Sequence, residues 1–220
     1  MQTLPGVKPM TSPIQTAPNN LDRIFTSDPA AFAEAYLGYL RTVLQRIDTA
    51  DIGRFIGTLL AARERGARVF FIGNGGSAAT ASHFANDLSI GTNEYDTPFR
   101  VMSLTDNVAI LTAIGNDFGY EEIFVRQLRV LGTQGDVVIG ISASGNSPNL
   151  LRAFEYARSA GIRTVAITAF DGGKMKALAD EGVHVPTGMK EYGPAEDAHM
   201  VLDHLVGAYL LRYLQHARGR

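Results

Sequence analysis

Two short loops rich in glycine and serine, each directly after an apolar run, constrain the fold of this chain most. The first Gly/Ser loop has the sequence GNGGS at residues 73–77 and follows VFFI at residues 69–72. The second Gly/Ser loop has the sequence SASGNS at residues 142–147 and follows VVIGI at residues 137–141. A β-branched and aromatic run predicts a strand, small residues predict a tight turn, and the apolar-periodic stretch that comes next predicts a helix. The chain therefore contains the strand–loop–helix unit twice.

Each of these units predicts a binding site for a phosphate group. Unpaired N–H groups at a helix N-terminus carry partial positive charge, and serine hydroxyls donate hydrogen bonds to phosphate oxygens without the charge of lysine. Glycine and serine are also ordinary turn and cap residues, so one such loop alone would fit a plain turn equally well. Two loops favour a small phosphorylated ligand. Neither loop matches a Walker A motif or the G-x-G-x-x-G dinucleotide fingerprint, which disfavours nucleoside triphosphates and NAD.

The composition is that of a globular protein, and it limits the classes of ligand. The 220 residues are 45% hydrophobic and 19% charged, which is enough for one substantial core. A net charge of −2 supplies no basic stripe for a phosphodiester backbone, so we expect no nucleic-acid partner. The chain has no cysteine, so any metal site must use histidines and carboxylates.

The N-terminal 20 residues differ in composition from the rest of the chain. They carry four prolines among polar residues and show no apolar periodicity. We therefore expect a flexible segment at residues 1–20 and a single domain at residues 21–220. The segment lacks the layout of a signal peptide, and no apolar stretch reaches the ~18 residues that span a bilayer, so we expect a cytoplasmic protein without a membrane partner.

The apolar pattern predicts alternating helices and strands. We expect strands at residues 69–72, 100–104, 136–141, 163–168 and 182–186. We expect helices at residues 30–46, 52–65, 78–88, 108–114, 120–131, 148–160, 174–179 and 194–216, with a turn at residues 115–119 and a polar loop from Gly91. Strands joined by right-handed helical crossovers form a parallel sheet covered on both faces. The prediction is an α/β three-layer sandwich with five parallel strands, an N-terminal helical hairpin and a long C-terminal helix.

His83 and Asp87 form the first candidate pair for chemistry. They stand four residues apart on the helix predicted after the first Gly/Ser loop. That spacing places both side chains on one face of the helix, about one turn apart. The pair is therefore within reach of one metal ion or one substrate.

The start of the last predicted helix holds the densest group of histidines and carboxylates: Glu196, Asp197, His199, Asp203 and His204. On spacing alone, this group fits a solvated acidic helix start as well as it fits a metal site. Glu196 and His204 lie roughly 12 Å apart along a regular helix, so one ion could join them only if the side chains lean together or the first turn is distorted. Pairing between subunits is the alternative, and Glu196 with His199 is the easier pair by geometry.

Five motifs, taken in order, resemble the sedoheptulose-7-phosphate isomerase family, also called phosphoheptose isomerases. They are GNGGS at residues 73–77, HFA at 83–85, GNDFG at 115–119, GISASGNS at 140–147 and DGGKM at 171–175. The resemblance extends from about residue 23 to about residue 214. It implies the sugar-isomerase (SIS) fold for the domain.

The resemblance also implies an activity and an assembly. The expected reaction is the aldose–ketose isomerisation of sedoheptulose 7-phosphate to D-glycero-D-manno-heptose 7-phosphate through an enediol, in heptose biosynthesis. The expected assembly is a homotetramer with active sites between subunits and one zinc ion per subunit. The expected partner is thus a small phosphorylated sugar.

The matched motifs assign site residues. Phosphate would contact Ser142, Ala143, Ser144 and Ser147. The substrate would also contact Asn74, Gly75, Gly76, Ser77, Asn116, Asp117 and Glu196. The zinc ligands would be His83, Asp87, Glu196 and His204. Asp87 and His204 would move the protons at C1 and C2 while zinc and nearby amides hold the developing oxyanion.

The chain departs from the family pattern at three positions. Asp87 stands where the family has glutamate, and Glu196 stands where glutamine is usual. Gly91 stands at a position where the family usually has an arginine. Aspartate is one methylene shorter, so its carboxylate must approach through a backbone shift or lose contact with the substrate carbon. A carboxylate at position 196 adds charge that would tighten the binding of a divalent ion.

Two other functions stay open at this level. The chain could be a non-catalytic SIS regulator that binds phosphosugars or proteins, resembling the DnaA-initiator-associating protein, although the presence of His83 and His204 argues against this. It could also be an SIS isomerase for another sugar phosphate. Gly91 and Glu196 leave this second alternative open.

Overall fold

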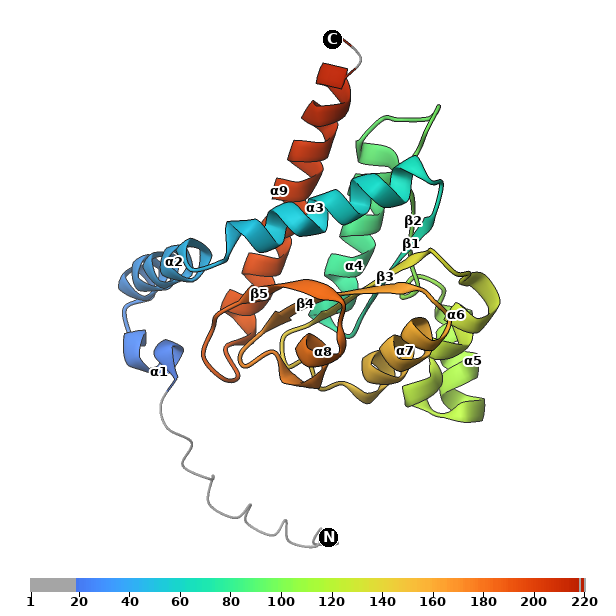
Figure 1. The fold of residues 1–220 in the computed structure, drawn as a ribbon. Coiled ribbons are helices and arrows are strands. Elements are labelled where there is room, and N and C mark those ends of the chain that lie inside the picture. Colours follow the sequence, from blue (N-terminus) through green and yellow to red (C-terminus); the bar gives the residue numbers. More distant parts are fainter. Residues whose placement is uncertain (1–18, 218, 220) are drawn as a thin grey trace, which may run out of the picture.

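The computed structural model describes residues 19–217 and 219, and these form a parallel sheet between two layers of helices (Figure 1). The flexible segment predicted for residues 1–20 falls outside the described residues, except for its last two positions. Asn19 caps the short helix α1 (Asn20–Ile24) by accepting a hydrogen bond from the backbone N–H of Asp22. None of the helices in the described part of the chain combines the length and apolar character needed to cross a membrane.

The sheet has five parallel strands. They are β1 (Arg68–Gly73), β2 (Arg100–Ser103), β3 (Val137–Ser142), β4 (Arg163–Ala169) and β5 (Glu181–Val185). Their order across the sheet is β2-β1-β3-β4-β5. Every residue of the central strand β3 is buried, as expected for a parallel strand covered on both faces. The predicted α/β sandwich with five parallel strands is confirmed.

Each face of the sheet has its own hydrophobic core. Helices α3 (Thr49–Glu64), α4 (Gly76–Asn86) and α9 (Tyr192–Ala217) pack on one face. Helices α6 (Val125–Leu131), α7 (Pro148–Ser159) and α8 (Gly173–Leu178) pack on the other. Neighbouring strand residues point to opposite faces, so Phe71 stacks on Phe84 of α4 at 4.8 Å between ring centroids, whereas Phe70 joins the second core.

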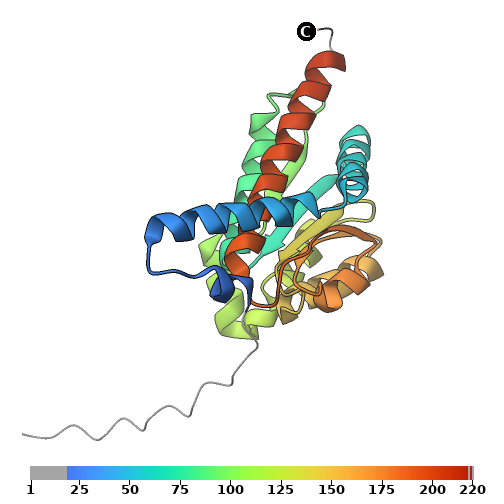
Figure 2. The same cartoon turned by 90° about the vertical axis from the view of Figure 1, so that its left-hand side faces the viewer.

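The two predicted N-terminal helices are present but are arranged crosswise. Helix α2 (Pro29–Gln45) begins with Pro29 at its first position, after the Asp28 side chain accepts a hydrogen bond from the Ala30 N–H. In Figure 1, α3 lies across the view and α2 is seen nearly end-on, and Figure 2 shows the reverse. Helix α3 begins at Thr49 rather than at residue 52, because the Asp48 side chain caps the Ala50 N–H.

The turn predicted at residues 115–119 is wrong. Helix α5 (Val108–Phe118) continues through Gly115 and ends only at Gly119, which has a φ of 100°. A glycine inside a helix is tolerated, whereas a positive φ ends the helix. The helix predicted at residues 120–131 is shorter as well, because a 3-10 turn (Tyr120–Glu122) precedes α6.

The helix after the first Gly/Ser loop also differs from the prediction. Helix α4 begins at Gly76, two residues earlier than expected, and ends at Asn86. A π-helical turn (Asp87–Gly91) follows, which includes the last two residues of the predicted helix and the first residue of the predicted polar loop. Asp87 therefore lies where the backbone changes from α to π geometry, a feature that is frequent at functional sites.

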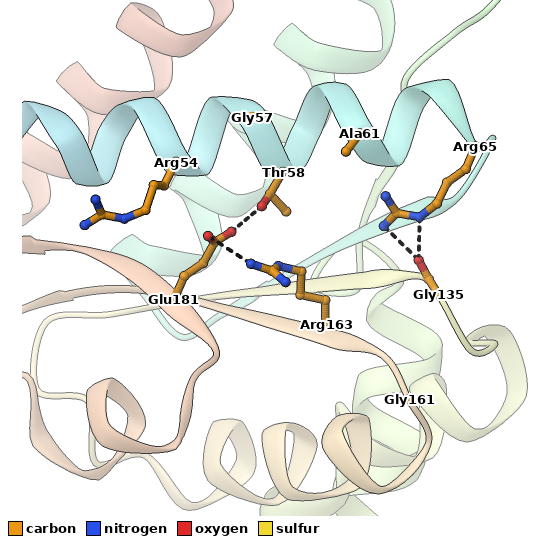
Figure 3. A pocket seen from close by; sticks show the side chains of 9 residues that line it. All are labelled: Arg54, Gly57, Thr58, Ala61, Arg65, Gly135, Gly161, Arg163 and Glu181. Atoms are coloured by element: carbon orange, nitrogen blue, oxygen red, sulfur yellow. Dashed lines mark hydrogen bonds and ion pairs between the residues drawn. The ribbon is translucent and has the colours of Figure 1, made fainter.

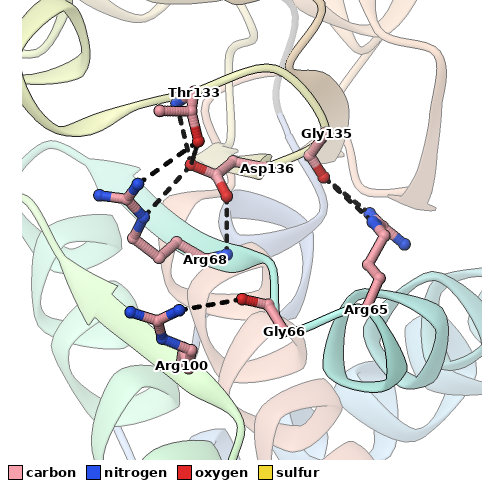
Figure 4. A network of polar contacts seen from close by, with 7 residues as sticks. All are labelled: Arg65, Gly66, Arg68, Arg100, Thr133, Gly135 and Asp136. Atoms are coloured by element: carbon pink, nitrogen blue, oxygen red, sulfur yellow. Dashed lines mark hydrogen bonds and ion pairs between the residues drawn. The ribbon is translucent and has the colours of Figure 1, made fainter.

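A polar network ties together the loops at the amino ends of β1, β2 and β3 (Figure 4). The Asp136 carboxylate accepts hydrogen bonds from the Arg68 backbone N–H at 2.8 Å and from the Thr133 backbone N–H at 2.9 Å. The Arg65 guanidinium donates to the Gly135 carbonyl oxygen at 2.9 Å. These contacts hold together the amino ends of the strands, at the opposite end of the sheet from the Gly/Ser loops.

Candidate functional site

The two Gly/Ser loops meet at the carboxyl ends of β1 and β3, at the centre of the sheet. After β1 the chain turns onto one face as α4 and continues to β2 at the edge. After β3 it turns onto the other face as α7 and continues to β4. The two connections therefore diverge between β1 and β3, which is where parallel α/β sheets bind ligands. The N-termini of α4 and α7 lie on either side of this point.

A pocket of about 150 Å³ lies between the loops. Its lining includes seven of the predicted substrate contacts: Asn74, Ser77, Ser142, Ala143, Ser144, Ser147 and Glu196. Ile141 and Tyr192 complete the wall, and the sequence did not point to either residue. Ser147 is the N-cap residue of α7, yet its side chain makes no capping hydrogen bond. Its hydroxyl is therefore not committed to the helix.

A pair of amide side chains joins the two loops. The Asn74 Nδ2 donates to Asn149 Oδ1 at 3.0 Å, and the Asn149 Nδ2 donates to Asn74 Oδ1 at 2.8 Å. Tyr120 donates its hydroxyl hydrogen to the same Asn74 oxygen at 2.9 Å. Asn149 is buried on α7, and its position two residues after Ser147 suggested only a helix start. This pairing fixes the positions of the two Gly/Ser loops relative to each other.

The second loop is supported by the DGGKM segment. Gly145 has a φ of 61°, and a Cβ there would lie 2.0 Å from the Gly172 carbonyl oxygen, so only glycine fits. The Met175 N–H donates to the Gly145 carbonyl oxygen at 2.9 Å, and the Lys174 N–H donates to Asn146 Oδ1 at 3.1 Å. The DGGKM segment therefore supports the backbone of the second Gly/Ser loop.

Glu196 lies against the first loop. A Cβ at Gly76 would lie 2.2 Å from Glu196 Oε2, so the start of α4 leaves room for this carboxylate only because position 76 is glycine. Burial raises the pKa of the Glu196 carboxyl, and the neighbouring Asp197 adds to the effect. Gly75, also predicted to contact substrate, is the N-cap residue of α4 with a φ of 55°.

A cluster of two histidines and two aspartates forms where α4 packs on α9. In His83, Asp87, Asp203 and His204, one possible ligand atom from each residue lies within 4.8 Å of all the others. The Nε2 atoms of His83 and His204 are 3.3 Å apart. His83 Nε2 lies 3.6 Å from Asp87 Oδ2 and 3.7 Å from Asp203 Oδ2. We call these four residues the His/Asp cluster.

The spacing within the His/Asp cluster fits a divalent metal ion. Ligand atoms about 2.0–2.1 Å from zinc, at the corners of a tetrahedron, lie about 3.3–3.4 Å from one another. The three separations from His83 Nε2, 3.3, 3.6 and 3.7 Å, equal that edge or exceed it by a few tenths of an ångström, and all the possible ligand atoms of the cluster lie within 4.8 Å of one another. Imidazole nitrogens and carboxylate oxygens are also donor types that zinc accepts.

Asp203 forms the closed side of the cluster. It is fully buried, and burial raises the pKa of its carboxyl to about 7, with Asp87 adding repulsion. His204 and His83 are partly open to solvent, so the cluster is closed at Asp203 and accessible from the other side.

Four predicted or candidate residues lie elsewhere. Glu196 belongs to the pocket between the loops and not to the His/Asp cluster. Asn116 and Asp117 are exposed near the end of α5, where the Asn116 amide donates to Asp117 Oδ1 at 2.8 Å. His199 is fully buried, and burial lowers the pKa of its imidazole to about 4. The predicted roles of Glu196, Asn116 and Asp117 stay predictions.

A larger hollow of about 590 Å³ lies at the opposite end of the sheet, beneath α3 (Figure 3). Its arginines already have partners within the chain. Arg163 pairs with Glu181 at 3.2 Å, Arg65 donates to Gly135, and Arg54 pairs with Asp51. Within residues 19–217, neither a histidine nor a Gly/Ser loop lines this hollow. The pocket between the loops is therefore the better candidate site, although it is smaller.

Comparison with known proteins identifies the family. Residues 34–169 match the SIS domain family. The phosphoheptose isomerase of Burkholderia pseudomallei is 40% identical over 158 residues, which cover 71% of this chain and 79% of that protein. The phosphoheptose isomerase of Aliarcobacter butzleri is 35% identical over 192 residues, which cover 85% of this chain and 99% of that protein.

Solved structures agree with this match. A phosphoheptose isomerase from Neisseria gonorrhoeae superposes with a TM-score of 0.72 at 31% identity, covering 82% of this chain and 95% of that chain. One from Francisella tularensis has a TM-score of 0.74 at 23% identity, which supports the fold. The predicted SIS fold is confirmed, while the exact bounds of a domain at residues 21–220 stay a prediction. The chain belongs to the phosphoheptose isomerase family of SIS-domain proteins.

Proposed function

We propose that this protein interconverts sedoheptulose 7-phosphate and D-glycero-D-manno-heptose 7-phosphate, in heptose biosynthesis. One observation carries the proposal: both Gly/Ser loops line a single pocket, and α4 leads from that pocket directly to the His/Asp cluster. His83 lies seven residues after Gly76, about 10 Å along α4. A site for a terminal phosphate and a site for proton transfer are thus separated along one helix, as a phosphorylated sugar chain requires.

The pocket would bind the phosphate without a cationic side chain. The N-termini of α4 and α7 supply positive potential, and the hydroxyls of Ser142, Ser144 and Ser147 supply donors. None of the lysines and arginines that the structure describes lines the pocket. The phosphate would therefore orient the sugar while the reacting carbons extend away from the loops.

Asp87 and His204 would carry the proton transfers. An aldose–ketose isomerisation moves one proton between neighbouring carbons and one between their oxygens, so it needs a base and an acid near both. The two side chains come from different helices and meet in the His/Asp cluster. One of them removes the carbon-bound proton, and the other moves the hydroxyl proton as the enediol forms.

His83, Asp87 and His204 would also hold a zinc ion. When bound, the ion would act as a Lewis acid that stabilises negative charge on the substrate oxygens. The donor types and the spacing of the cluster support this assignment.

The remaining parts of the proposal concern location and assembly. A cytoplasmic location and a homotetramer with active sites between subunits follow from the family resemblance. Asn116 and Asp117 lie on an exposed surface in one chain, which suits a contribution to a neighbouring subunit's site. These three statements stay predictions.

The test is incubation of metal-loaded protein with sedoheptulose 7-phosphate, with formation of the aldose followed with and without a chelator. The proposal predicts aldose formation that the chelator suppresses. Tight binding without turnover would instead support a non-catalytic regulator. Turnover of a different ketose phosphate, with none of sedoheptulose 7-phosphate, would support an isomerase of other specificity.

A further inference from the structure

Asp203 has the environment of a metal ligand, although the family resemblance did not assign it that role. Its side chain is fully buried, and neither carboxylate oxygen has a hydrogen-bond partner in the described part of the chain. An ionised carboxylate that is removed from water needs hydrogen bonds, an opposite charge or a metal. The buried side of the His/Asp cluster therefore presents two oxygen atoms without hydrogen-bond partners.

These oxygens face the histidine pair. Asp203 Oδ2 lies 3.7 Å from His83 Nε2, and His83 Nε2 lies 3.3 Å from His204 Nε2. The 3.7 Å separation is too long for a hydrogen bond but is close to the edge of a zinc coordination tetrahedron, about 3.3–3.4 Å. The neighbouring carboxylate, Asp87, lies at a similar 3.6 Å from the same nitrogen. A cation between these groups would contact both carboxylates and both imidazoles.

Glu196 does not occupy that position within the chain. It lines the pocket between the Gly/Ser loops, where Gly76 makes room for it. Its separation from His204 along α9 is about 12 Å, whereas Asp203 is the residue directly before His204. Among the described residues, Asp203 and not Glu196 belongs to the group whose possible ligand atoms lie within 4.8 Å of one another around the two histidines.

We propose that Asp203 is a direct ligand of a divalent cation, so that His83, Asp87, Asp203 and His204 form a complete site within one chain. Glu196 then faces the substrate pocket and is not a metal ligand. The proposal rests on the proposed function only for the expectation that an ion is used. Its tests use the metal alone, so their outcome is independent of whether sedoheptulose 7-phosphate is the substrate.

The first test compares metal affinities. Full-length protein is stripped with a chelator, and zinc binding is measured by competition with a chromophoric chelator. Asp203→Asn should weaken binding by more than about 100-fold, beyond the 10- to 100-fold typical of residues that only orient a ligand. Glu196→Gln should change affinity by less than about threefold. A threefold or smaller loss in Asp203→Asn, or an equal loss in Glu196→Gln, would overturn the proposal.

The second test reports direct bonding. The chain has no cysteine, so a single introduced thiol is unique. Asp203→Cys loaded with Co²⁺ should show a near-ultraviolet thiolate-to-cobalt charge-transfer band, because a thiolate at this position would bond the metal. Glu196→Cys, the matched control, should show none. A band in Glu196→Cys and none in Asp203→Cys would contradict the assignment.

The third test guards against misfolding. Without metal, Asp203→Asn should be at least as stable as the wild type, because it removes a buried carboxylate whose oxygens accept no hydrogen bond from the described residues. Added zinc should raise the melting temperature of the wild type much more than that of the variant. Equal zinc-induced shifts in the two proteins would show that Asp203 is not a ligand.

Discussion

The proposed chemistry depends on side chains that a helix pair brings together. His83 and Asp87 lie at the end of α4 and in the π-helical turn that follows it, and His204 comes from α9. The i, i+4 spacing predicted that His83 and Asp87 would share a face, and the structure places His83 Nε2 3.6 Å from Asp87 Oδ2. Their meeting with His204 depends on the packing of α4 against α9, which no local pattern specifies.

Removing the acid or the base should stop turnover but not substrate binding. General acid–base catalysis contributes about 10²- to 10⁴-fold, so Asp87→Asn and His204→Ala should each lose at least about 100-fold in kcat at saturating zinc. Phosphosugar binding, measured by calorimetry, should stay within about threefold of wild type, because in the proposed function the phosphate would bind at the Gly/Ser loops. Wild-type turnover in either variant would refute these roles.

The buried imidazole of His199 should make stability depend on pH. Burial lowers the pKa of His199 from 6.5 to about 4, so between these values the unfolded chain binds a proton that the folded state excludes. Metal-free protein should lose up to about 3 kcal/mol of stability as pH falls from about 7 to 4 through this group. Urea unfolding at several pH values measures this change in the free energy of unfolding.

His199→Leu, which has no titrating group, is the matched comparison. Its unfolding free energy should vary less with pH than that of the wild type over the same window. Identical pH profiles for the two proteins would show that His199 does not titrate as its burial requires.

Among single residues, the sequence located most of the pocket and part of the His/Asp cluster. The serines of the second Gly/Ser loop and Asn74 follow directly from the motifs, and all of them line the pocket. Asp203 was visible as part of an acidic group, but burial distinguishes it from its solvated neighbours, and burial is a property of packing. Asn149 and Tyr192 carried no signal, because an asparagine or a tyrosine at a helix start is common.

At the level of elements, the strand–loop–helix units were predictable because their signals are local. Each loop carries its own glycine and serine pattern, and each strand is a short apolar run. Helix α5 was not predicted correctly. The glycine at position 115 suggested a turn, but the apolar residues before it continue helical packing, and the backbone takes up its positive φ at Gly119 instead.

Replacing Gly115 tests this helix directly. A Cβ at Gly115 would meet no atom within 4 Å, and the residue lies inside α5. Gly115→Ala should therefore stabilise the protein by roughly 0.5–1 kcal/mol, the usual preference of a helix for alanine. Chemical denaturation measures the change. A loss of stability would indicate a backbone conformation that requires glycine, as the predicted turn did.

At the level of the whole molecule, α9 presents an apolar surface that one chain does not cover. Its second half projects beyond the sheet (Figures 1 and 2). Val201, Leu205, Tyr209 and Tyr213 follow one another at four-residue intervals, each 40–47% exposed. Exposed apolar stripes of this kind mark association surfaces. The stripe supports the predicted homotetramer, which the sequence reached only through the family resemblance.

A charge placed on this stripe should disrupt the assembly. Tyr209→Glu combined with Tyr213→Glu would bury two carboxylates in an apolar interface, which is strongly unfavourable. Sedimentation velocity should show a tetramer for the wild type and smaller species for the double variant. Ser159→Glu, on exposed α7 surface, is the control and should sediment as the wild type does. A double variant that remains tetrameric would place the interface elsewhere.

The central claim is that the pocket and the His/Asp cluster together isomerise a phosphorylated ketose by proton transfer. The most direct measurement is NMR of sedoheptulose 7-phosphate incubated in D₂O with zinc-loaded wild-type protein and with His204→Ala. The account predicts that the wild type forms the aldose 7-phosphate with deuterium at C2 and that the variant forms essentially none. Ketose that stays unchanged and undeuterated with saturating wild-type protein would contradict it.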